Sequence, residues 1–419
     1  MKKIYFKTFG CRTNIYDTEL LKSYIKDFQI INDENIADII VINSCTVTNG
    51  ADSGLRHYIN QVKSTNSNVK FILTGCGAIS RGKELLDKSE IFGVFGAGEK
   101  SKINDFLKQD TSFYNIWNLN FKDTKIISNY QNHTKAFVKI QEGCNFACSY
   151  CIIPSVRGKS RSLNQDDIIN QIKLLAQNGY NEIVLTGTNI GSYGKDIGFS
   201  LGGLLSKIGV IPGIKRVRLG SIEPIQVDDA FCEILDESWL EKHLHLALQH
   251  TNQEMLTLMR RRNKLKKDIE LFEFLASKGF ALGTDFIVGH PGETDTIWQD
   301  ALDNFKKFPL THLHAFIYSK RDGTYSVELA KKFGEIPGDI SKHRLNAIKD
   351  IVLENNYNFR LKNKHTPLEV LVEQKKGEFY EGYDQFFNKV LIKTDKDITK
   401  SWIILKDYEV EFENTKAWL

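Results

Sequence analysis

Three cysteines crowd into residues 144–151 at a spacing that can hold a metal cluster. Cys144, Cys148 and Cys151, here called the motif triad, form a C-x3-C-x2-C pattern. A structural zinc site closes with four ligands, whereas a 4Fe-4S cluster held by three thiolates leaves one iron open. The alternatives are three buried thiols or half of a zinc site, but isolated core cysteines have no reason to cluster so tightly. The spacing therefore favours a cluster that does chemistry.

Three further cysteines follow the strands of a predicted parallel sheet near the amino terminus. The pattern predicts strands at residues 4–9, 38–43 and 70–74, separated by helices at 17–28 and 55–62. Each strand is followed by one member of what we call the strand-end triad: Cys11, Cys45 and Cys76. Parallel strands end at one edge of a sheet, where open α/β folds bind ligands, so we expect these thiols to converge. The alternative is three scattered thiols.

A longer series of alternating strands and helices begins at residue 135. The predicted strands lie at residues 137–141, 182–186, 216–220, 243–248, 283–288 and 312–318. The motif triad follows the first of these strands directly. In β/α barrels this end of the strands carries the active site, so location and chemistry agree. Six units instead of eight predict a partial (β/α)6 barrel, open enough for a large substrate.

The carboxyl-terminal pattern changes to short strands after a predicted helix at residues 341–361. These strands lie at residues 368–373, 378–383, 389–392, 402–404 and 408–412, and they predict a small antiparallel β-barrel. Such barrels bind oligonucleotides about as often as they only pack on a neighbour. The predicted order is thus a Rossmann-like parallel α/β domain, a linker, the partial barrel and the β-barrel, at residues 1–110, 111–134, 135–362 and 363–419.

Composition supports this organisation and narrows the class of protein. A chain of 419 residues exceeds one ordinary core, which predicts two or three domains. With 41% hydrophobic and 26% charged residues it offers no membrane span, and the amino terminus has no apolar stretch long enough for a signal peptide. We therefore expect a cytoplasmic protein with reduced thiols. Seven cysteines there indicate metal or redox chemistry instead of a disulfide framework.

A net charge of only +4 is compatible with a nucleic-acid partner but does not by itself indicate one. The basic residues are nevertheless clustered, just after the motif triad and again near residue 260. Our candidates for phosphate contacts are Arg157, Arg260, Arg261, Arg262 and Lys264. The alternative for each cluster is a solvated helix face or loop.

Taken together, these motifs resemble the methylthiotransferase family of radical S-adenosylmethionine (SAM) enzymes over essentially the whole chain. Residues 8–14, 43–48 and 74–76 are similar to that family's three auxiliary-cluster boxes, and residues 143–158 are similar to its radical SAM box. The carboxyl-terminal barrel would correspond to its TRAM domain, which contacts RNA.

The resemblance implies two 4Fe-4S clusters and SAM as cofactors. The strand-end triad would hold the auxiliary cluster, and the motif triad would hold the cluster that binds and cleaves SAM. The hydrogen on adenine C2 lies on an sp² carbon that no protein acid or base readily deprotonates, so its replacement by a methylthio group calls for radical chemistry from a cofactor. Such an enzyme also needs an electron donor and a sulfur donor, but no membrane.

A branch within the family is indicated by Arg12 in Gly-Cys-Arg-Thr-Asn. This residue resembles the branch that acts on N6-threonylcarbamoyladenosine at position 37 of tRNA, in the anticodon stem-loop. The isopentenyladenosine branch usually has Gln-Met there. The alternatives are methylthiolation of N6-isopentenyladenosine-37, methylthiolation of ribosomal protein S12, and a non-catalytic iron-sulfur protein that binds RNA.

The resemblance also assigns residues that bind SAM. They are Tyr150 in the motif and a set at the strand ends: Thr186, Gly187, Thr188, Glu223, Gln249, Ile287 and Gly289. The alternative for Glu223 is a helix cap. Family members commonly show Pro-Leu-Gln-Ser-Gly in the fourth barrel strand, whereas residues 247–251 read Ala-Leu-Gln-His-Thr. The histidines at strand ends we interpret as packing or hydrogen-bonding residues: His243, His245, His250, His290, His312 and His314.

Overall fold

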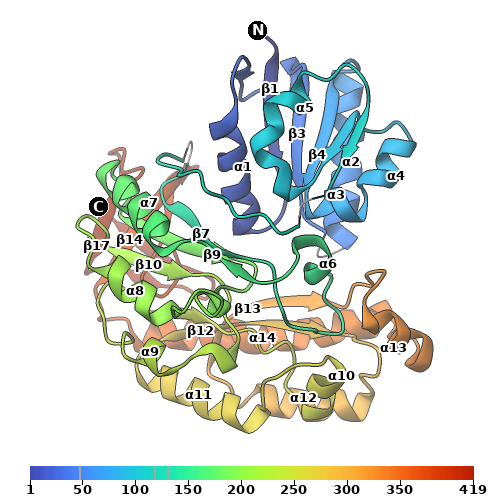
Figure 1. The fold of residues 1–419 in the computed structure, drawn as a ribbon. Helices are drawn as coiled ribbons and strands as arrows, with labels where there is room; N and C mark the ends of the chain where they lie inside the picture. Colours follow the sequence, from blue (N-terminus) through green and yellow to red (C-terminus); the bar gives the residue numbers. More distant parts are fainter. Residues whose placement is uncertain (47–48, 118, 131–132) are drawn as a thin grey trace.

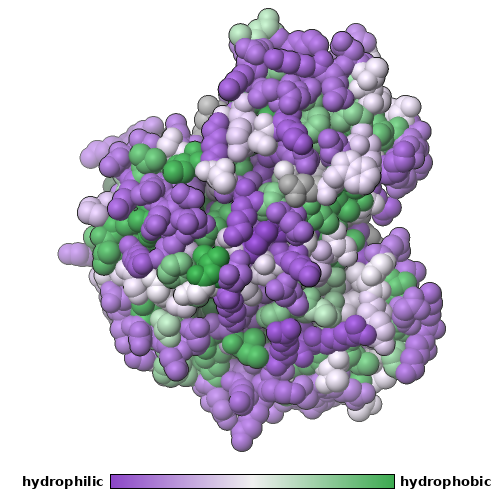
Figure 2. Space-filling view, viewed as in Figure 1, coloured by the Kyte–Doolittle hydropathy of each residue, from purple (hydrophilic) through white to green (hydrophobic). Residues whose placement is uncertain are grey.

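The computed structural model describes residues 1–46, 49–117, 119–130 and 133–419, excluding the side chains of 49–52. Figure 1 shows an amino-terminal sheet standing above a larger body that holds the remaining sheets. Hydrophilic residues cover most of the visible face, and hydrophobic residues lie between them in small groups (Figure 2). No helix in the described part of the chain has the length and apolar character needed to cross a membrane.

The amino-terminal sheet has six parallel strands in the order β2-β1-β3-β4-β5-β6. Its central strand β3 is buried along its whole length, as the continuous apolar run of a strand covered on both faces requires. The strands are β1 (Lys3–Thr8), β2 (Gln29–Ile30), β3 (Ile39–Ser44), β4 (Lys70–Gly75), β5 (Gly93–Phe95) and β6 (Phe113–Asn115). The helices are α1 (Arg12–Tyr24), α2 (Asn49–Thr65), α3 (Cys76–Ser80), α4 (Gly82–Asp87) and α5 (Ile103–Leu107). The predicted Rossmann-like sheet is confirmed.

The central domain contains the six predicted strands. Four strands form a sheet in the order β10-β9-β7-β8 and three form a sheet in the order β11-β12-β13. Parallel bridges at Val217–Leu240 and Ile222–Leu246 join the two sheets. The strands are β7 (Ala136–Glu142), β8 (Arg161–Ser162), β9 (Glu182–Gly187), β10 (Arg216–Leu219), β11 (His243–His245), β12 (Ala281–Val288) and β13 (Leu310–Ile317). No pairing between β7 and β13 occurs among the described strands, so the barrel is open, as predicted.

Helices cover the outer face of this open barrel (Figure 1). The side chain of Asn164 begins α7 by accepting hydrogen bonds from the backbone of Asp166 and Asp167, and these acids complement the helix dipole. The helices are α6 (Ile153–Arg157), α7 (Gln165–Gln177), α8 (Leu201–Gly209), α9 (Asp229–Cys232), α10 (Gln253–Leu258), α11 (Leu265–Ser277), α12 (Asp295–Phe305), α13 (Tyr325–Phe333) and α14 (Gly338–Lys362). Short α6 lies at the junction with the amino-terminal sheet, beside α3.

The carboxyl-terminal strands form a curled sheet in the order β17-β14-β15-β16-β19-β18. They are β14 (Leu368–Lys376), β15 (Phe379–Tyr383), β16 (Lys389–Lys393), β17 (Trp402–Leu405), β18 (Glu409–Val410) and β19 (Thr415–Trp418). The sequence pattern missed β19, which pairs parallel with β16 in an otherwise antiparallel sheet. Buried Arg218 of the barrel donates to the carbonyl of Asp384, which fixes this sheet against the barrel.

The segment expected to be a linker, residues 111–134, contributes to both neighbours. Strand β6 extends the amino-terminal sheet beyond residue 110 by pairing with β5. Further along, Ile127 and Tyr130 are buried in the core of the barrel. The polar composition of this segment predicted only a connection between domains. Its few apolar residues nevertheless pack against both neighbouring domains.

Candidate active site

The strand-end triad lines one cavity of about 560 Å³. Cys11 lies between β1 and α1, Cys45 follows β3, and Cys76 begins α3 after β4. Gly10 has a φ of +101°, and a Cβ there would lie 2.3 Å from the Cβ of Cys45, so only glycine lets these loops approach so closely. The expected convergence of the three thiols at the sheet edge is confirmed.

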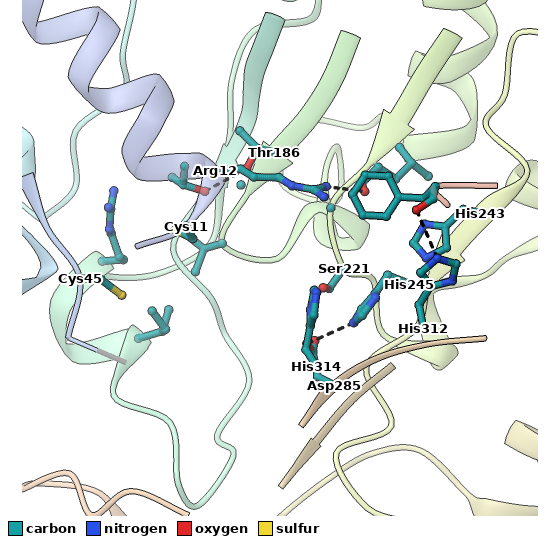
Figure 3. Close-up of a pocket in the computed structure, with 18 of the residues that line it drawn as sticks. Cys11, Arg12, Cys45, Thr186, Ser221, His243, His245, Asp285, His312 and His314 are labelled. Atoms are coloured by element: carbon teal, nitrogen blue, oxygen red, sulfur yellow. Dashed lines mark hydrogen bonds and ion pairs between the residues drawn. The ribbon is translucent and has the colours of Figure 1, made fainter. Parts of the chain in front are cut away.

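The opposite wall of this cavity consists of the carboxyl ends of the barrel strands. Figure 3 shows the cysteines on one side and a group of histidines with Asp285 on the other. The walls meet where the hydroxyl groups of Thr13 and Thr186 lie 3.1 Å apart. The barrel residues of the wall include Thr186, Gly187, Thr188, Ser221, His243, His245, Asp285, His312 and His314.

The motif triad lies in the loop between β7 and α6 and lines a second cavity of about 180 Å³. The Cys144 sulfur accepts hydrogen bonds from the Phe146 backbone and from the Asn189 amide, both at 3.4 Å. The Cys148 sulfur accepts from Nη1 of Arg261 at 3.7 Å. Ile153, Thr188, Ser221 and Asp285 line both cavities, so the two cavities adjoin.

The residues predicted to bind SAM divide among the cavities. Tyr150, Thr188, Glu223 and Gln249 line the second cavity with the motif triad. Thr186 and Gly187 instead line the first cavity. Ile287 lines a third cavity, of about 250 Å³, together with Tyr150 and Gln249. Gly289 lines none of these three cavities; a Cβ there would lie 2.3 Å from Oγ of Ser341.

Arg157 was predicted to contact tRNA phosphate, and the structure contradicts this. Its side chain is 2% exposed. It donates to Asp17 at 2.7 Å, to Glu142 at 3.0 Å, to Asn14 at 2.7 Å and, through Nε, to the Cys76 sulfur at 3.0 Å. Arg157 therefore ties the loop of the motif triad to the strand-end triad.

Arg157 belongs to a buried ion network that joins the amino-terminal domain to the barrel. Lys139 of β7 is fully buried and donates to Asp17 and Glu142, both at 2.7 Å. Lys100 and Asp123 complete the network, so its three acids balance its three bases. Burial acts to raise the pKa of Asp17, but Lys100, Lys139 and Arg157 outweigh it and hold that pKa well below its ordinary range.

The basic residues near position 260 do not all face the solvent. Arg261, predicted to contact tRNA, instead turns inward and forms a bidentate ion pair with Glu223 and a hydrogen bond of 2.6 Å to the carbonyl of Ala247. Arg260, Arg262 and Lys264 are exposed. Arg262 stacks on Phe146, with its guanidinium carbon 4.3 Å from the ring centroid, so this basic surface borders the second cavity.

Residues 247–251 depart from the pattern of the resembled family at three positions: Ala247 lines the second cavity, whereas His250 and Thr251 lie away from it. His250 is fully buried and bonds to Glu293 at 3.3 Å, and Thr251 donates to the carbonyl of Ala301. Gln249 remains at the second cavity, with a φ of +67°. The departure therefore changes the lining of the second cavity only at Ala247, and its other two changes lie in the core behind the site.

The cysteines fit polynuclear clusters better than single ions. Among the described residues, the sets of three ligand atoms within 4.8 Å of one another contain no cysteine, so the sulfurs of each triad are spread more widely than the ligands of one ion. N–H donors to the sulfurs are the groups that tune Fe-S clusters. In the second cavity Nε of Arg261 is buried without a hydrogen-bond partner among the described atoms, which leaves a polar position for a ligand.

Sequence analysis missed several residues of the site. Asn189 follows Thr188 at a strand end, a position that could have marked it. Lys139 stands inside the apolar strand β7, where a charge signals a buried partner. Nothing local marked Asp17 on α1, because its partners come from three distant segments.

Two family models match the two parts of the chain that carry the cysteine triads. The radical SAM superfamily matches residues 138–305, and the uncharacterised family UPF0004 matches residues 3–96. The radical SAM methyltransferase TsrM from Kitasatospora setae, in a structure with cobalamin and a 4Fe-4S cluster bound, has a TM-score of 0.59 at 14% identity, over 79% of this chain and 78% of that one. At this identity the likeness concerns the fold alone.

Curated relatives cover nearly the whole chain. A Helicobacter pylori protein with a provisional methylthiotransferase name is 51% identical over all of both chains. Threonylcarbamoyladenosine tRNA methylthiotransferase MtaB of Aquifex aeolicus is 34% identical over 91% of this chain and 95% of its own. The tRNA-2-methylthio-N(6)-dimethylallyladenosine synthase of Halalkalibacterium halodurans is 31% identical over 89% of this chain and 72% of its own.

The buried ion network around Asp17 predicts how a substitution there changes the free energy of unfolding. Asp17→Asn keeps the shape but leaves three buried cations against two acids, so the free energy of unfolding should fall by about 3–5 kcal/mol. Chemical denaturation of the protein prepared without clusters measures this. Asp27→Asn is the control: Asp27 forms an exposed ion pair with Lys108 at 3.2 Å, and its loss should change stability by less than about 1 kcal/mol. Equal effects of the two substitutions would contradict the network's role.

Proposed function

This chain belongs to the methylthiotransferase family of radical SAM enzymes, and we propose that it converts N6-threonylcarbamoyladenosine at position 37 of tRNA to its 2-methylthio derivative. The observation that carries the proposal is the shared cavity: the strand-end triad faces the ends of the barrel strands, beside the cavity of the motif triad. A substrate in that space would lie between two groups of thiols. The Aquifex aeolicus relative carries the same substrate in its name.

Enzymes of this family bind 4Fe-4S clusters and SAM, which supply the radical chemistry and the methylthio group that an sp² carbon demands. We assign one cluster to Cys11, Cys45 and Cys76 and the other to Cys144, Cys148 and Cys151. The chain would position these groups and exclude water from them. Arg157 would do so for both, because its guanidinium donates to the Cys76 sulfur from the helix that follows the motif triad.

We assign SAM to the second cavity and to the third cavity beyond Tyr150. Glu223, held by Arg261, would present a fixed carboxylate to the amino group of SAM, since anchored acceptors orient a ligand without rearranging. Gln249 and Tyr150 line both cavities and would bridge them. Ile287 would give an apolar contact to the adenine. Thr186 and Gly187 line the first cavity, so we assign them to the substrate and not to SAM.

We assign tRNA phosphate contacts to the exposed basic surface formed by Arg260, Arg262 and Lys264. This surface borders the second cavity, and the guanidinium carbon of exposed Arg260 lies 3.6 Å from the Tyr325 ring centroid. The carboxyl-terminal sheet contributes Phe387 to the wall of the first cavity, which is consistent with a TRAM-like role in holding RNA. An electron donor and a sulfur donor complete the partners, and a tRNA substrate agrees with the cytoplasmic location expected from the sequence.

The second candidate substrate is N6-dimethylallyladenosine in tRNA, which is the isopentenyladenosine considered above. Its support is the Halalkalibacterium halodurans relative, whose name carries it, at 31% identity. The two substrates differ in the group on N6, which is charged in one and a hydrocarbon in the other.

Iron content tests the cluster assignment. After anaerobic reconstitution the chain should hold about eight irons, and the triple variant C11A/C45A/C76A or C144A/C148A/C151A should each hold about four, because each triad anchors one cluster. Iron assay and absorption spectroscopy measure this. Cys232→Ala, on α9 outside both cavities, is the control and should keep the full amount. A triple variant with undiminished iron would disprove the assignment of that triad.

Charge reversal tests the basic surface. In R260E/R262E/K264E, tRNA affinity should drop at least tenfold at moderate salt, and the slope of log affinity against log salt should decrease by about 2–3. The control is K173E/K278E, which reverses exposed charges on α7 and just after α11. If both variants bind tRNA equally well, the tRNA contacts lie elsewhere.

Nucleoside analysis tests the reaction itself. In a host lacking tRNA methylthiotransferases, expression of this chain should produce 2-methylthio-N6-threonylcarbamoyladenosine, detected by mass spectrometry of digested tRNA. Cys148→Ala should abolish it, because the motif triad would lose a cluster ligand. Appearance of the dimethylallyl derivative alone would move the substrate to the second candidate. Absence of both from cells whose enzyme holds its iron would contradict a tRNA substrate.

A further inference from the structure

The first cavity contains a cation without an acidic partner. Arg12 begins α1 directly after Cys11, and its guanidinium reaches across the cavity toward the barrel (Figure 3). There Nη1 donates to the carbonyl of Leu219 at 3.2 Å, and the guanidinium carbon lies 5.5 Å from the Phe387 ring centroid. Among the described residues no carboxylate lies within 4.0 Å of Arg12, so its charge is held in place but not neutralised.

Acids that could neutralise Arg12 are already occupied. Asp285 is the one acid among the described residues that line this cavity. It accepts from His245 at 3.1 Å and from His314 at 3.3 Å. Burial acts to raise the pKa of Asp285, but these two imidazoles outweigh it and keep that pKa below its ordinary range. Glu241, behind the wall, is paired with Arg218 at 2.8 Å.

The histidine wall offers a further polar position. Nε2 of His243 is buried and has no hydrogen-bond partner among the described atoms. Burial lowers the pKa of His243 well below its ordinary value, and it lowers that of His312, beside it, to about 3. These two imidazoles are therefore neutral near pH 7. Both ring nitrogens of His312 are already bonded, to Thr311 and to the carbonyl of Phe387, so His243 is the one that can exchange a hydrogen bond with a polar ligand. Of the two arginines that line this cavity, Arg157 is paired with Asp17 and Glu142, so the positive charge left unpaired is that of Arg12.

We propose that Arg12 binds the carboxylate of the threonyl group when N6-threonylcarbamoyladenosine enters this cavity. This inference rests on the proposed function and goes further, because it names the residue that selects the substrate. A guanidinium and a carboxylate match in charge and in geometry. A hydrocarbon on N6 would cover Arg12 without offering its charge an acid, and would cover Nε2 of His243 without offering it a hydrogen bond, which costs binding energy and rejects such a substrate.

Three separate parts of the chain hold the guanidinium in place. Arg12 itself comes from the amino-terminal sheet edge, Leu219 from the end of β10, and Phe387 from the loop between β15 and β16. Phe387 is held in turn, stacked on His243 at 5.2 Å and on Tyr383 at 5.0 Å between ring centroids. A guanidinium fixed in this way loses little conformational freedom when it binds an anion.

A charge-swap experiment tests the proposal. Anticodon stem-loops carry either N6-threonylcarbamoyladenosine or its neutral carboxamide analogue, and kcat/KM for methylthiolation is measured together with Kd by fluorescence anisotropy. The native enzyme should prefer the carboxylate by about 10- to 100-fold, as expected for a charge-assisted hydrogen bond. Arg12→Gln should reduce that preference to less than about threefold, whereas Arg12→Lys should keep a larger part of it.

Controls separate this inference from other failures. Because Arg12 is next to Cys11, iron content and SAM cleavage without RNA establish that the clusters of each variant are intact. A native enzyme that treats carboxylate and carboxamide alike, or an Arg12→Gln enzyme that keeps the full preference, would overturn the inference and leave the proposed function standing. Turnover of the dimethylallyl stem-loop with none of the threonylcarbamoyl one would overturn both.

Discussion

The buried ion network around Asp17 is the constraint on which the rest of this structure depends. It lies between the amino-terminal sheet and the barrel, where it cannot exchange with water, so each charge must find a protein partner. Asp17 from α1, Lys139 from β7 and Arg157 from α6 can satisfy one another in only one relative placement of their elements. That placement brings the two cysteine triads to neighbouring cavities.

Arg157 connects this ion network to the cysteines of the candidate site. Its Nε donates to the Cys76 sulfur, while its other nitrogens are held by Asn14, Asp17 and Glu142. Burial raises the pKa of the Cys76 thiol to about 11, although the guanidinium acts to lower it. Under the cluster assignment proposed above, the bound metal would displace the thiol proton, and the Arg157 guanidinium would then face a thiolate. The same residue therefore serves assembly and the site.

The first cavity is formed by residues from the amino-terminal, central and carboxyl-terminal parts of the chain. The amino-terminal sheet provides thiols and Arg12, the barrel provides histidines and Asp285, and the carboxyl-terminal sheet provides Phe387. Cysteines on one wall and polar side chains on the other divide the space between reactive groups and groups suited to recognition (Figure 3). Such a division allows the substrate class to change through Arg12 and the polar wall while the cluster ligands stay the same.

The sequence by itself determined the cysteine triads and the sheet edge that gathers the strand-end triad, because thiol spacing and the alternation of strands and helices are local properties. It did not determine which charged side chains are buried in ion pairs and which are exposed. Arg157, Arg261 and Arg262 look alike in the sequence, yet the first two are buried against acids and the third is exposed. Only the tertiary structure decided this, since the partners Asp17 and Glu223 come from distant segments. A charged side chain's role depends on what the fold places beside it.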